Sequence, residues 1–326
     1  MKGFVMYYLS FPGLGIEPFH IDKAAFTMFG RSVAWYGILI TCGMVLAVLF
    51  SLWVGKKENV SSDDILDLAF TVIVFGVIGA RAYYVIFSWD KFNYLVTSAV
   101  SDGTLIGTLS AFFRNLWGTF VNCIALWNGG LAIYGGVIGG LVSGYVFSRI
   151  KKIEFLKVFD ILAPAVTIGQ IVGRWGNFIN IEAFGGETDL PWRMGISLSM
   201  DGGESFVSEM FVHPTFLYES LWNMVGLVLL FFIYYKGKKF NGQACGTYFI
   251  WYGFGRALIE GLRTDSLMIG PLRVSQMIGI VSVVIGVILF AVLGTKAKEN
   301  KNEDGEYVPV YDKLEEKSEE SAKTEE

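Results

Sequence analysis

The sequence predicts an all-α integral membrane protein with seven transmembrane helices, its N-terminus outside the cell and its C-terminus in the cytosol. Three observations support this fold class. Of the 326 residues, 53% are hydrophobic and only 17% are charged, which is a membrane-protein composition. Seven apolar stretches are long enough to cross a bilayer core, which takes about twenty helical residues. The connections between them alternate between basic and acidic, which indicates the direction of each span.

The predicted spans together make a transmembrane catalytic domain over residues 32–294. They are expected at roughly 32–54, 65–89, 126–148, 158–181, 217–235, 243–262 and 274–294. The connections KKENVSSDD, RIKKIEFLK and KGKK are rich in Lys and Arg, whereas the loop from Glu182 to Thr215 holds Arg193 among several acids. Because basic loops remain in the cytosol, the first span is expected to enter the membrane from outside.

Segments outside the spans are assigned by composition. Residues 1–31 are expected to form an N-terminal outer or interfacial segment, and residues of about 182–216 an outer loop. The connection at about 90–125 (TLIGTLSAFFRNLWGTFVNCIALW) is too apolar to lie in water, so we expect it along the outer interface. From residue 295 to 326 there are six lysines against eleven acidic residues, which favours a disordered acidic cytosolic tail.

Charge and the scarcity of cysteine and histidine argue against several function classes. A net charge of −4 leaves no basic face for nucleic acid. Cys42, Cys123 and Cys245 are scattered and without a CxxC pair, so neither a disulfide framework nor a thiolate zinc site is expected. His20 and His213 lie far apart, which leaves little room for a zinc protease or a serine triad. We expect no metal and no cofactor.

Three arginines interrupt the apolar spans. Arg81, Arg174 and Arg256 each lie about seven or eight residues before the outer end of a span that runs outward, roughly 10–12 Å below the surface. Tyr36 and Tyr134 reach about the same level from outside. A guanidinium at a helix centre costs roughly 2.5–3.5 kcal/mol on insertion scales, so an anion has to compensate. We interpret the level as a cradle for an anionic head group; the alternative is structural pairing or snorkelling.

Helical spacing groups these arginines with other polar residues. One stripe, about 80° wide at 100° per residue, consists of Tyr252, Arg256, Glu260 and Arg263. Glu260 can therefore pair with either arginine of its own helix. A second polar face consists of Gln170, Arg174 and Asn177. Glu182 lies roughly 80° round from that face if the helix continues.

A long motif surrounds Arg174. The stretch GRWGNFINIEAFG, from Gly173 to Gly185, closely resembles the signature G-R-x-G-N-F-x-N-x-E-x-x-G of bacterial prolipoprotein diacylglyceryl transferases. Further motifs of that family agree in order: Trp35-Tyr36-Gly37, Gly79-Ala80-Arg81-Ala82-Tyr83-Tyr84, Gly129-Gly130-Leu131 through Tyr134-Gly135-Gly136, His213-Pro214-Thr215, Leu217-Tyr218-Glu219, and Tyr252-Gly253-Phe254-Gly255-Arg256 with Glu260 and Arg263.

The resemblance implies an enzyme that moves the diacylglyceryl group of phosphatidylglycerol to the lipobox cysteine thiol of a preprolipoprotein, with glycerol 1-phosphate leaving. It also implies a multi-pass protein of the bacterial cell membrane whose active site faces the outer leaflet. Its partners would be phosphatidylglycerol, lipobox-containing preprolipoproteins and membrane lipids, and no nucleic acid. The candidate catalytic residues are Arg174, Arg256, Tyr134 and Glu182. The candidate substrate-binding residues are Tyr36, Arg81, Asn177, Asn180, Gly185, Tyr252, Glu260 and Arg263.

The chain departs from the family pattern at two positions. Tyr134 stands where many members carry His, and Phe216 where Gln is common. A phenol is a poor base at neutral pH unless nearby cations stabilise the phenolate. The group that takes the thiol proton is therefore open between Tyr134, Glu182 and the arginine field alone.

A second class of membrane protein would also place arginines at one depth in the membrane. A carrier or flippase for an anionic lipid or solute would place cations at a translocation site. The sequence lacks inverted repeats, and its polar groups lie on one side of the membrane, which favours the transferase. Vesicles with phosphatidylglycerol and a lipobox peptide distinguish the two by whether a thioether forms.

Overall fold

The computed structural model describes residues 6–28, 30–92, 105–126, 129–203, 205–264 and 267–299. The chain forms two compact units. The first comprises Met1–Asn59 with Phe159–Glu326, and the second comprises Val60–Val158. The predicted tail beyond residue 299 and the connection at 93–104 lie outside the described residues.

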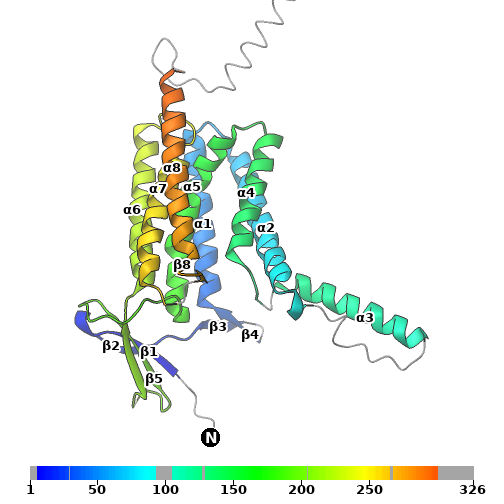
Figure 1. The fold of residues 1–326 in the computed structure, drawn as a ribbon, viewed down its shortest axis with the longest axis vertical. Coiled ribbons are helices and arrows are strands. Elements are labelled where there is room, and N and C mark those ends of the chain that lie inside the picture. The colour runs from blue at the N-terminus through cyan, green and yellow to red at the C-terminus, as the bar shows by residue number, and fades with distance from the viewer. Residues whose placement is uncertain are drawn as a thin grey trace, which may run out of the picture. The chain divides into compact units, whose positions relative to one another are not determined.

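Five helices belong to the first unit. They are α1 (Trp35–Lys57), α5 (Phe155–Asn180, whose first turn is counted with the second unit), α6 (Thr215–Lys236), α7 (Gln243–Ile259) and α8 (Val274–Glu299). Figure 1 shows α6, α7 and α8 side by side. The closest approach is between α7 and α8, where a Cβ on Gly253 would lie 2.5 Å from the carbonyl oxygen of Gly279. Glycine at that position lets the two backbones meet.

A β-sheet caps one end of the first unit. Its four antiparallel strands follow the order β2 (Ile16–His20), β1 (Met6–Phe11), β5 (Met194–Ser199) and β6 (Ser208–Val212). Figure 1 shows the sheet at the end where α5 finishes and α6 begins. The sheet residues Leu9, Phe11, Met194, Ile196 and Val212 form a buried apolar cluster with Phe216 of α6. The predicted N-terminal segment and the predicted outer loop thus form one sheet, which the sequence analysis missed.

Two short hairpins complete this end of the first unit. β3 (Ala24–Met28) pairs with β4 (Arg31–Ala34), which leads directly into α1. β7 (Met268–Ile269) pairs with β8 (Leu272–Arg273), which leads directly into α8. Each hairpin therefore sets where a long apolar helix starts.

Asp160 closes the opposite end of the first unit. Its carboxylate is fully buried and accepts from the backbone N–H groups of Gly242 (2.7 Å) and Cys245 (2.8 Å) at the start of α7. Lys238 pairs with it at 2.9 Å and with Glu58, at the end of α1, at 2.7 Å. Because Gly242 has no side chain to cap α7, Asp160 supplies the missing acceptor. These contacts set the position of α7 along its axis.

The second unit contains α2 (Ser62–Phe87), α3 (Leu105–Ile124) and α4 (Ile133–Ile150). Helices α2 and α4 pack closely, because a Cβ on Gly79 would lie 2.4 Å from the carbonyl oxygen of Gly135. Helix α3 falls in the connection predicted along the outer interface. Its exposed side chains include Phe113, Trp117 and Phe120.

The observed helix bounds correct the start of one predicted span, and they do not by themselves fix the number of spans. The third span was predicted from residue 126, but α4 begins at Ile133. The reason is local: Gly129 and Gly130 have φ of 74° and 77°, a left-handed backbone that no α-helix contains. Among the described residues, six helices are long and apolar enough to cross a membrane, and α7, with 17 residues, is not one of the six. The protein is a helical, multi-pass membrane protein.

Candidate functional site

The carboxyl end of α5 carries Arg174, Asn177 and Asn180. The helix ends at Asn180, because Ile181 and Ala183 both adopt left-handed backbone angles, with φ of 56° and 59°. The chain therefore turns back, and Glu182 Oε1 accepts from Asn177 Nδ2 at 2.9 Å and Asn180 Nδ2 at 3.2 Å. The helix does not continue to Glu182, so the condition for its predicted angle is not met, and the turn instead brings this carboxylate to the polar face.

The loop that follows is fastened to two other elements. Gly185 N–H donates to His213 O (2.9 Å), before α6, and Gly186 N–H donates to Leu262 O (2.8 Å), after α7. The Thr215 hydroxyl donates to Ala183 O. A Cβ on Gly185 would lie 2.6 Å from His213 Cβ, so a side chain would separate these backbones. Gly185 thus lies where two backbone segments approach closely. Its role in substrate binding stays a prediction.

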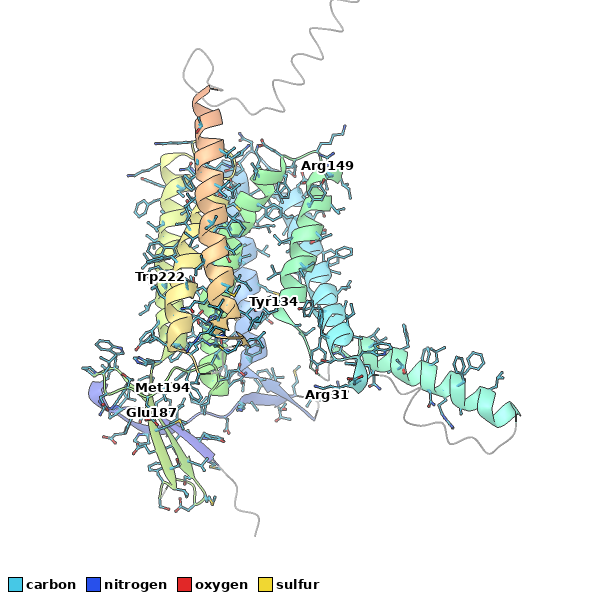
Figure 2. The ribbon with its side chains drawn as sticks, in the orientation of Figure 1. Arg31, Tyr134, Arg149, Glu187, Met194 and Trp222 are labelled. Carbon is cyan, nitrogen blue, oxygen red and sulfur yellow. The ribbon has the colours of Figure 1, made fainter. Side chains whose placement is uncertain are left out.

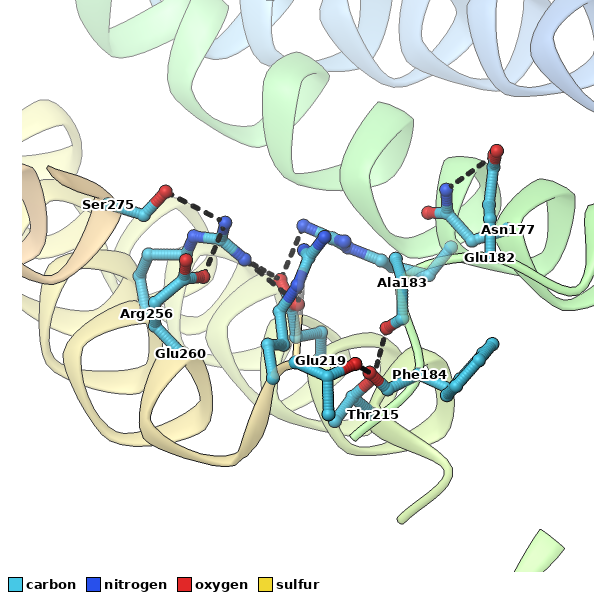
Figure 3. Close-up of polar contacts among 12 residues, drawn as sticks. Asn177, Glu182, Ala183, Phe184, Thr215, Glu219, Arg256, Glu260 and Ser275 are labelled. Carbon is cyan, nitrogen blue, oxygen red and sulfur yellow. Dashed lines mark hydrogen bonds and ion pairs between the residues drawn. The ribbon is translucent and has the colours of Figure 1, made fainter. Parts of the chain in front are cut away.

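Glu219, on the second turn of α6, is the centre of a buried ion cluster. Its side chain is 4% exposed. Oε2 lies 2.5 Å from Arg174 Nη2, and Oε1 lies 3.0 Å from Arg256 Nη1 and 3.8 Å from Arg263 Nη1. Figure 3 shows this carboxylate between guanidinium groups, with Glu182 and Asn177 forming a separate pair. One carboxylate thus joins cations from α5, from α7 and from the residue after the short 3-10 helix η4 (Glu260–Leu262).

Arg256 has a second anionic partner on its own helix. Arg256 Nη2 lies 2.7 Å from Glu260 Oε2 in an i,i+4 ion pair, whose angle falls outside hydrogen-bond geometry. Ser275 Oγ, at the start of α8, lies 3.2 Å from the same nitrogen. The predicted pairing of Glu260 with an arginine of its helix is confirmed. Arg273 supports the end of this helix by donating to the backbone oxygens of Glu260 and Arg263.

Two aromatic candidates adjoin the polar face of α5. A Cβ on Gly176 would lie 2.4 Å from Tyr36 Cδ2, so the Tyr36 ring packs on the glycine between Arg174 and Asn177. On α7 the ring of Tyr252 stacks on Tyr248, with centroids 5.4 Å apart and planes 5° apart. Tyr36 therefore lies against α5 two residues after Arg174, and Tyr252 lies one turn before Arg256 on α7.

Arg81 and Tyr134 belong to the second unit. The Arg81 guanidinium donates to four backbone oxygens, those of Asn122 (2.7 Å), Cys123 (2.9 Å), Gly129 (2.5 Å) and Gly130 (2.9 Å). It therefore binds the carbonyls at the carboxyl end of α3 and the glycine turn before α4. Figure 2 labels Tyr134 at the first turn of α4. That Arg81 and Tyr134 lie at the same depth in the membrane as the other arginines stays a prediction.

Glu219 is the site residue that the sequence analysis did not select. Its motif was recognised, but its role was not. The rule that singled out the arginines applies to it equally, because an acid within an apolar span is costly and usually has a functional or paired partner. Its position five residues into α6 was the available signal.

The cluster suits a phosphate ester better than a metal. Among the described residues, no group of three or more His, Cys, Asp and Glu side chains is placed to hold a metal ion. Three guanidinium groups offer planar, multiple N–H donors, which match phosphate and carboxylate oxygens. Two carboxylates reduce the cost of burying these cations, which is several kcal/mol per unpaired ion.

Comparison with known proteins gives a consistent result. The family model described as prolipoprotein diacylglyceryl transferase matches residues 23–292. Proteins named phosphatidylglycerol–prolipoprotein diacylglyceryl transferase are similar over most of the chain. The one from Clostridioides difficile (strain 630) is 42% identical over 284 residues, 87% of this chain and 100% of that protein. The one from Finegoldia magna is 43% identical over 82% of this chain and 94% of that protein, and the one from Listeria welshimeri is 40% identical over 85% and 92%.

Proposed function

The chain belongs to the prolipoprotein diacylglyceryl transferase family, and on that basis we propose that it moves the diacylglyceryl group of phosphatidylglycerol to the lipobox cysteine of a preprolipoprotein. It is a transferase of lipoprotein biogenesis and catalyses the first step of lipoprotein maturation. A carrier or flippase is not favoured, because the relatives are named for group transfer.

The buried ion cluster around Glu219 is the observation that carries the proposal. Arg174, Arg256 and Arg263 meet there at the ends of two apolar helices. Such an arrangement costs free energy unless it binds an anion. A phospholipid phosphate held by these arginines would place its glycerol carbons and acyl chains beside the apolar helices.

The reaction is a substitution at the sn-3 carbon of the glycerol that bears the acyl chains. The thiolate sulfur of the lipobox cysteine forms a bond to this carbon as the carbon–oxygen bond to phosphate breaks. The bonding electron pair stays on the phosphate oxygen, and glycerol 1-phosphate leaves. The thiol proton is released to a base or to water. Guanidinium donors stabilise the charge that develops on the departing oxygen, provided they bind the transition state better than the diester.

We assign Arg174 and Arg256 to this stabilisation. Tyr36, Asn177, Asn180, Tyr252, Glu260, Arg263, Gly185 and Arg81 are the proposed substrate-binding residues. Glu182 and Tyr134 remain the candidate proton acceptors, with the arginine field alone as the third choice. The geometry favours Glu182 for this role in one respect, since its two amide contacts hold it on the same helix end as Arg174.

We propose a seven-span arrangement with the site toward the outer leaflet of the bacterial cell membrane. The span that adds to the six long apolar helices is α7 continued by η4, which is the sixth in chain order and lies in one apolar stretch between α6 and α8. In the first unit, Lys56, Lys57 and Lys236 lie at the helix ends away from the sheet, the side the positive-inside rule assigns to the cytosol. Residues 1–31 and about 182–216 would then lie outside, residues 32–294 form the catalytic domain, and residues 295–326 form a cytosolic tail.

Reconstituted vesicles test the function directly. The purified chain in vesicles of phosphatidylglycerol, given a lipobox peptide, should yield a peptide heavier by one diacylglyceryl group, together with glycerol 1-phosphate. Matched controls are a Cys-to-Ser peptide and vesicles of phosphatidylethanolamine alone, which should give no product. Transfer of labelled lipid between leaflets without any thioether would instead support the carrier.

A further inference from the structure

Glu219 occupies the place at which three arginines converge. The exposed fraction of its side chain is only 4%, and both carboxylate oxygens lie within 3.1 Å of a guanidinium nitrogen. In the contacts to Arg174, Arg256 and Arg263, it engages one nitrogen of each. A guanidinium carries five N–H donors, which is more than one carboxylate contact engages. The Glu219 carboxylate thus lies beside the proposed phosphate site.

The position of Glu219 is fixed by its helix. Thr215, four residues earlier and fully buried, is bound to Ala183 O. Trp222, three residues later, donates to Trp251 O on α7 at 2.9 Å, and Trp251 donates to Trp222 O at 2.8 Å. Contacts on both sides of Glu219 therefore hold its carboxylate against α5 and α7.

The charged groups around Glu219 bear differently on two classes of phosphate ester. Three arginines and two glutamates, Glu219 and Glu260, leave the cluster with one net positive charge. Arg273, which donates to the backbone oxygens of Glu260 and Arg263, adds a further positive charge beside the cluster, and this charge is the same with or without Glu219. A phosphodiester carries one negative charge, whereas a phosphomonoester carries close to two above its second pKa of about 6. The negative charge of Glu219 or Glu260 therefore opposes a dianionic monoester more strongly than a monoanionic diester.

We propose that Glu219 is a specificity-determining residue, which limits the cluster to a monoanionic phosphodiester and disfavours a dianionic phosphomonoester. This inference rests on the proposed function, in which a diester is the substrate and glycerol 1-phosphate the product. Glu219 acts through the arginines that it contacts rather than on the reacting atoms. Its charge weakens binding of the product and of phosphatidic acid, and so helps the site to release what the reaction makes.

The test compares two soluble head groups on the detergent-solubilised full chain. Glycerol 1-phosphate is the monoester probe, and diglycerol phosphate is the diester probe. We expect Glu219→Gln to shift the ratio of their dissociation constants about tenfold or more toward the monoester at pH 8. At pH 5, where the monoester is largely monoanionic, the shift should be small. A residue that merely holds the fold would weaken both probes and leave their ratio unchanged.

Three matched variants complete the design. Glu219→Asp keeps the charge and should keep the original ratio. Glu260→Gln, which removes the other carboxylate, should shift the ratio in the same direction by less, and it also serves if Glu219→Gln does not fold. Glu209→Gln removes an exposed acid on β6 and should change nothing. An unchanged ratio in folded Glu219→Gln, or an equal shift in Glu209→Gln, would overturn the proposal.

Failure of the proposed role of Glu219 can be distinguished from failure of the proposed transferase function. If the unmodified chain forms no thioether with phosphatidylglycerol, the proposed function fails. If the unmodified chain is active and the probe ratio does not respond to Glu219→Gln, only the role of Glu219 fails.

Discussion

Trp222 of α6 and Trp251 of α7 each donate an indole N–H to the backbone oxygen of the other, at 2.9 and 2.8 Å, with their rings stacked 4.4 Å apart. Glycines make room for both rings, because a Cβ on Gly255 would lie 2.1 Å from Trp222 Nε1 and one on Gly226 would lie 2.5 Å from Trp251 Cδ1. This reciprocal pair fixes the register of the two helices that carry Glu219 and Arg256.

We expect Gly255→Ala to disturb the register of α6 and α7. The added methyl group would meet the Trp222 ring, and overpacking of this kind typically costs about 1–3 kcal/mol. The unfolding temperature in detergent should fall, and transfer activity should fall with it. Gly237→Ala, at the end of α6 with open space around it, is not a suitable control because its φ of 88° favours glycine. Gly118→Ala, where nothing lies within 4 Å, is the better control and should unfold as the unmodified chain does.

Arg256→Gln should lower turnover by about 10²–10³ without loss of folding, by analogy with removal of one oxyanion donor. Arg256→Lys should restore little, because a point charge does not reproduce the planar donors that contact Glu219 and Glu260 together. Single-turnover rates of thioether formation measure both effects. Near-normal turnover in Arg256→Gln would remove this residue from the catalytic set.

Substitutions of Tyr134 distinguish a role in binding the lipid phosphate from a role as the base. If its hydroxyl binds the lipid phosphate, which we expect, Tyr134→Phe should lose roughly 1–3 kcal/mol, up to about a hundredfold in rate, and the pH profile should keep its shape. If Tyr134 is the base, Tyr134→Phe should lose most activity, and Tyr134→His should retain much of it with a profile displaced to lower pH. A fully active Phe variant excludes both roles and leaves Glu182 or the arginine field.

Removal of the buried carboxylate of Asp160 should destabilise the first unit. Asp160→Asn leaves Lys238 with Glu58 alone and weakens the cap of α7; loss of one partner from a buried pair costs about 3–5 kcal/mol. Thermal unfolding in detergent measures the loss. Asp63→Asn, an exposed residue in the first turn of α2, should change the unfolding temperature far less.

Deletion of residues 300–326 should leave transfer activity in vesicles unchanged. This segment is polar and acidic, and the proposed topology places it on the side of the membrane away from the site. Activity of the truncated chain, compared at equal protein in the same vesicles, checks the expectation. A large loss would indicate that the tail contacts the catalytic domain or that the topology is inverted.

The sequence by itself determined the helical membrane class and the family, and it predicted that Glu260 pairs with Arg256 or Arg263. These follow from information close together in the chain. A long apolar run requires a helix because its backbone groups must be satisfied internally, the motif around Arg174 is contiguous, and residues four apart on a helix are neighbours. The end of α5 was placed within one residue for the same reason.

Only the tertiary structure decided which groups share an anion and which segments share a sheet. Glu219 joins arginines of α5 and α7 because helix register is set by packing, here by Trp222 and Trp251. Strand β1 pairs with β5, with Leu9 opposite Ile196, although neither segment has a pattern strong enough to predict a partner so far away. Arg81 binds the backbone oxygens of Asn122, Cys123, Gly129 and Gly130 because the turn at the two glycines returns the chain to α2. Spacing along a chain does not specify such contacts, since they depend on how separate elements pack.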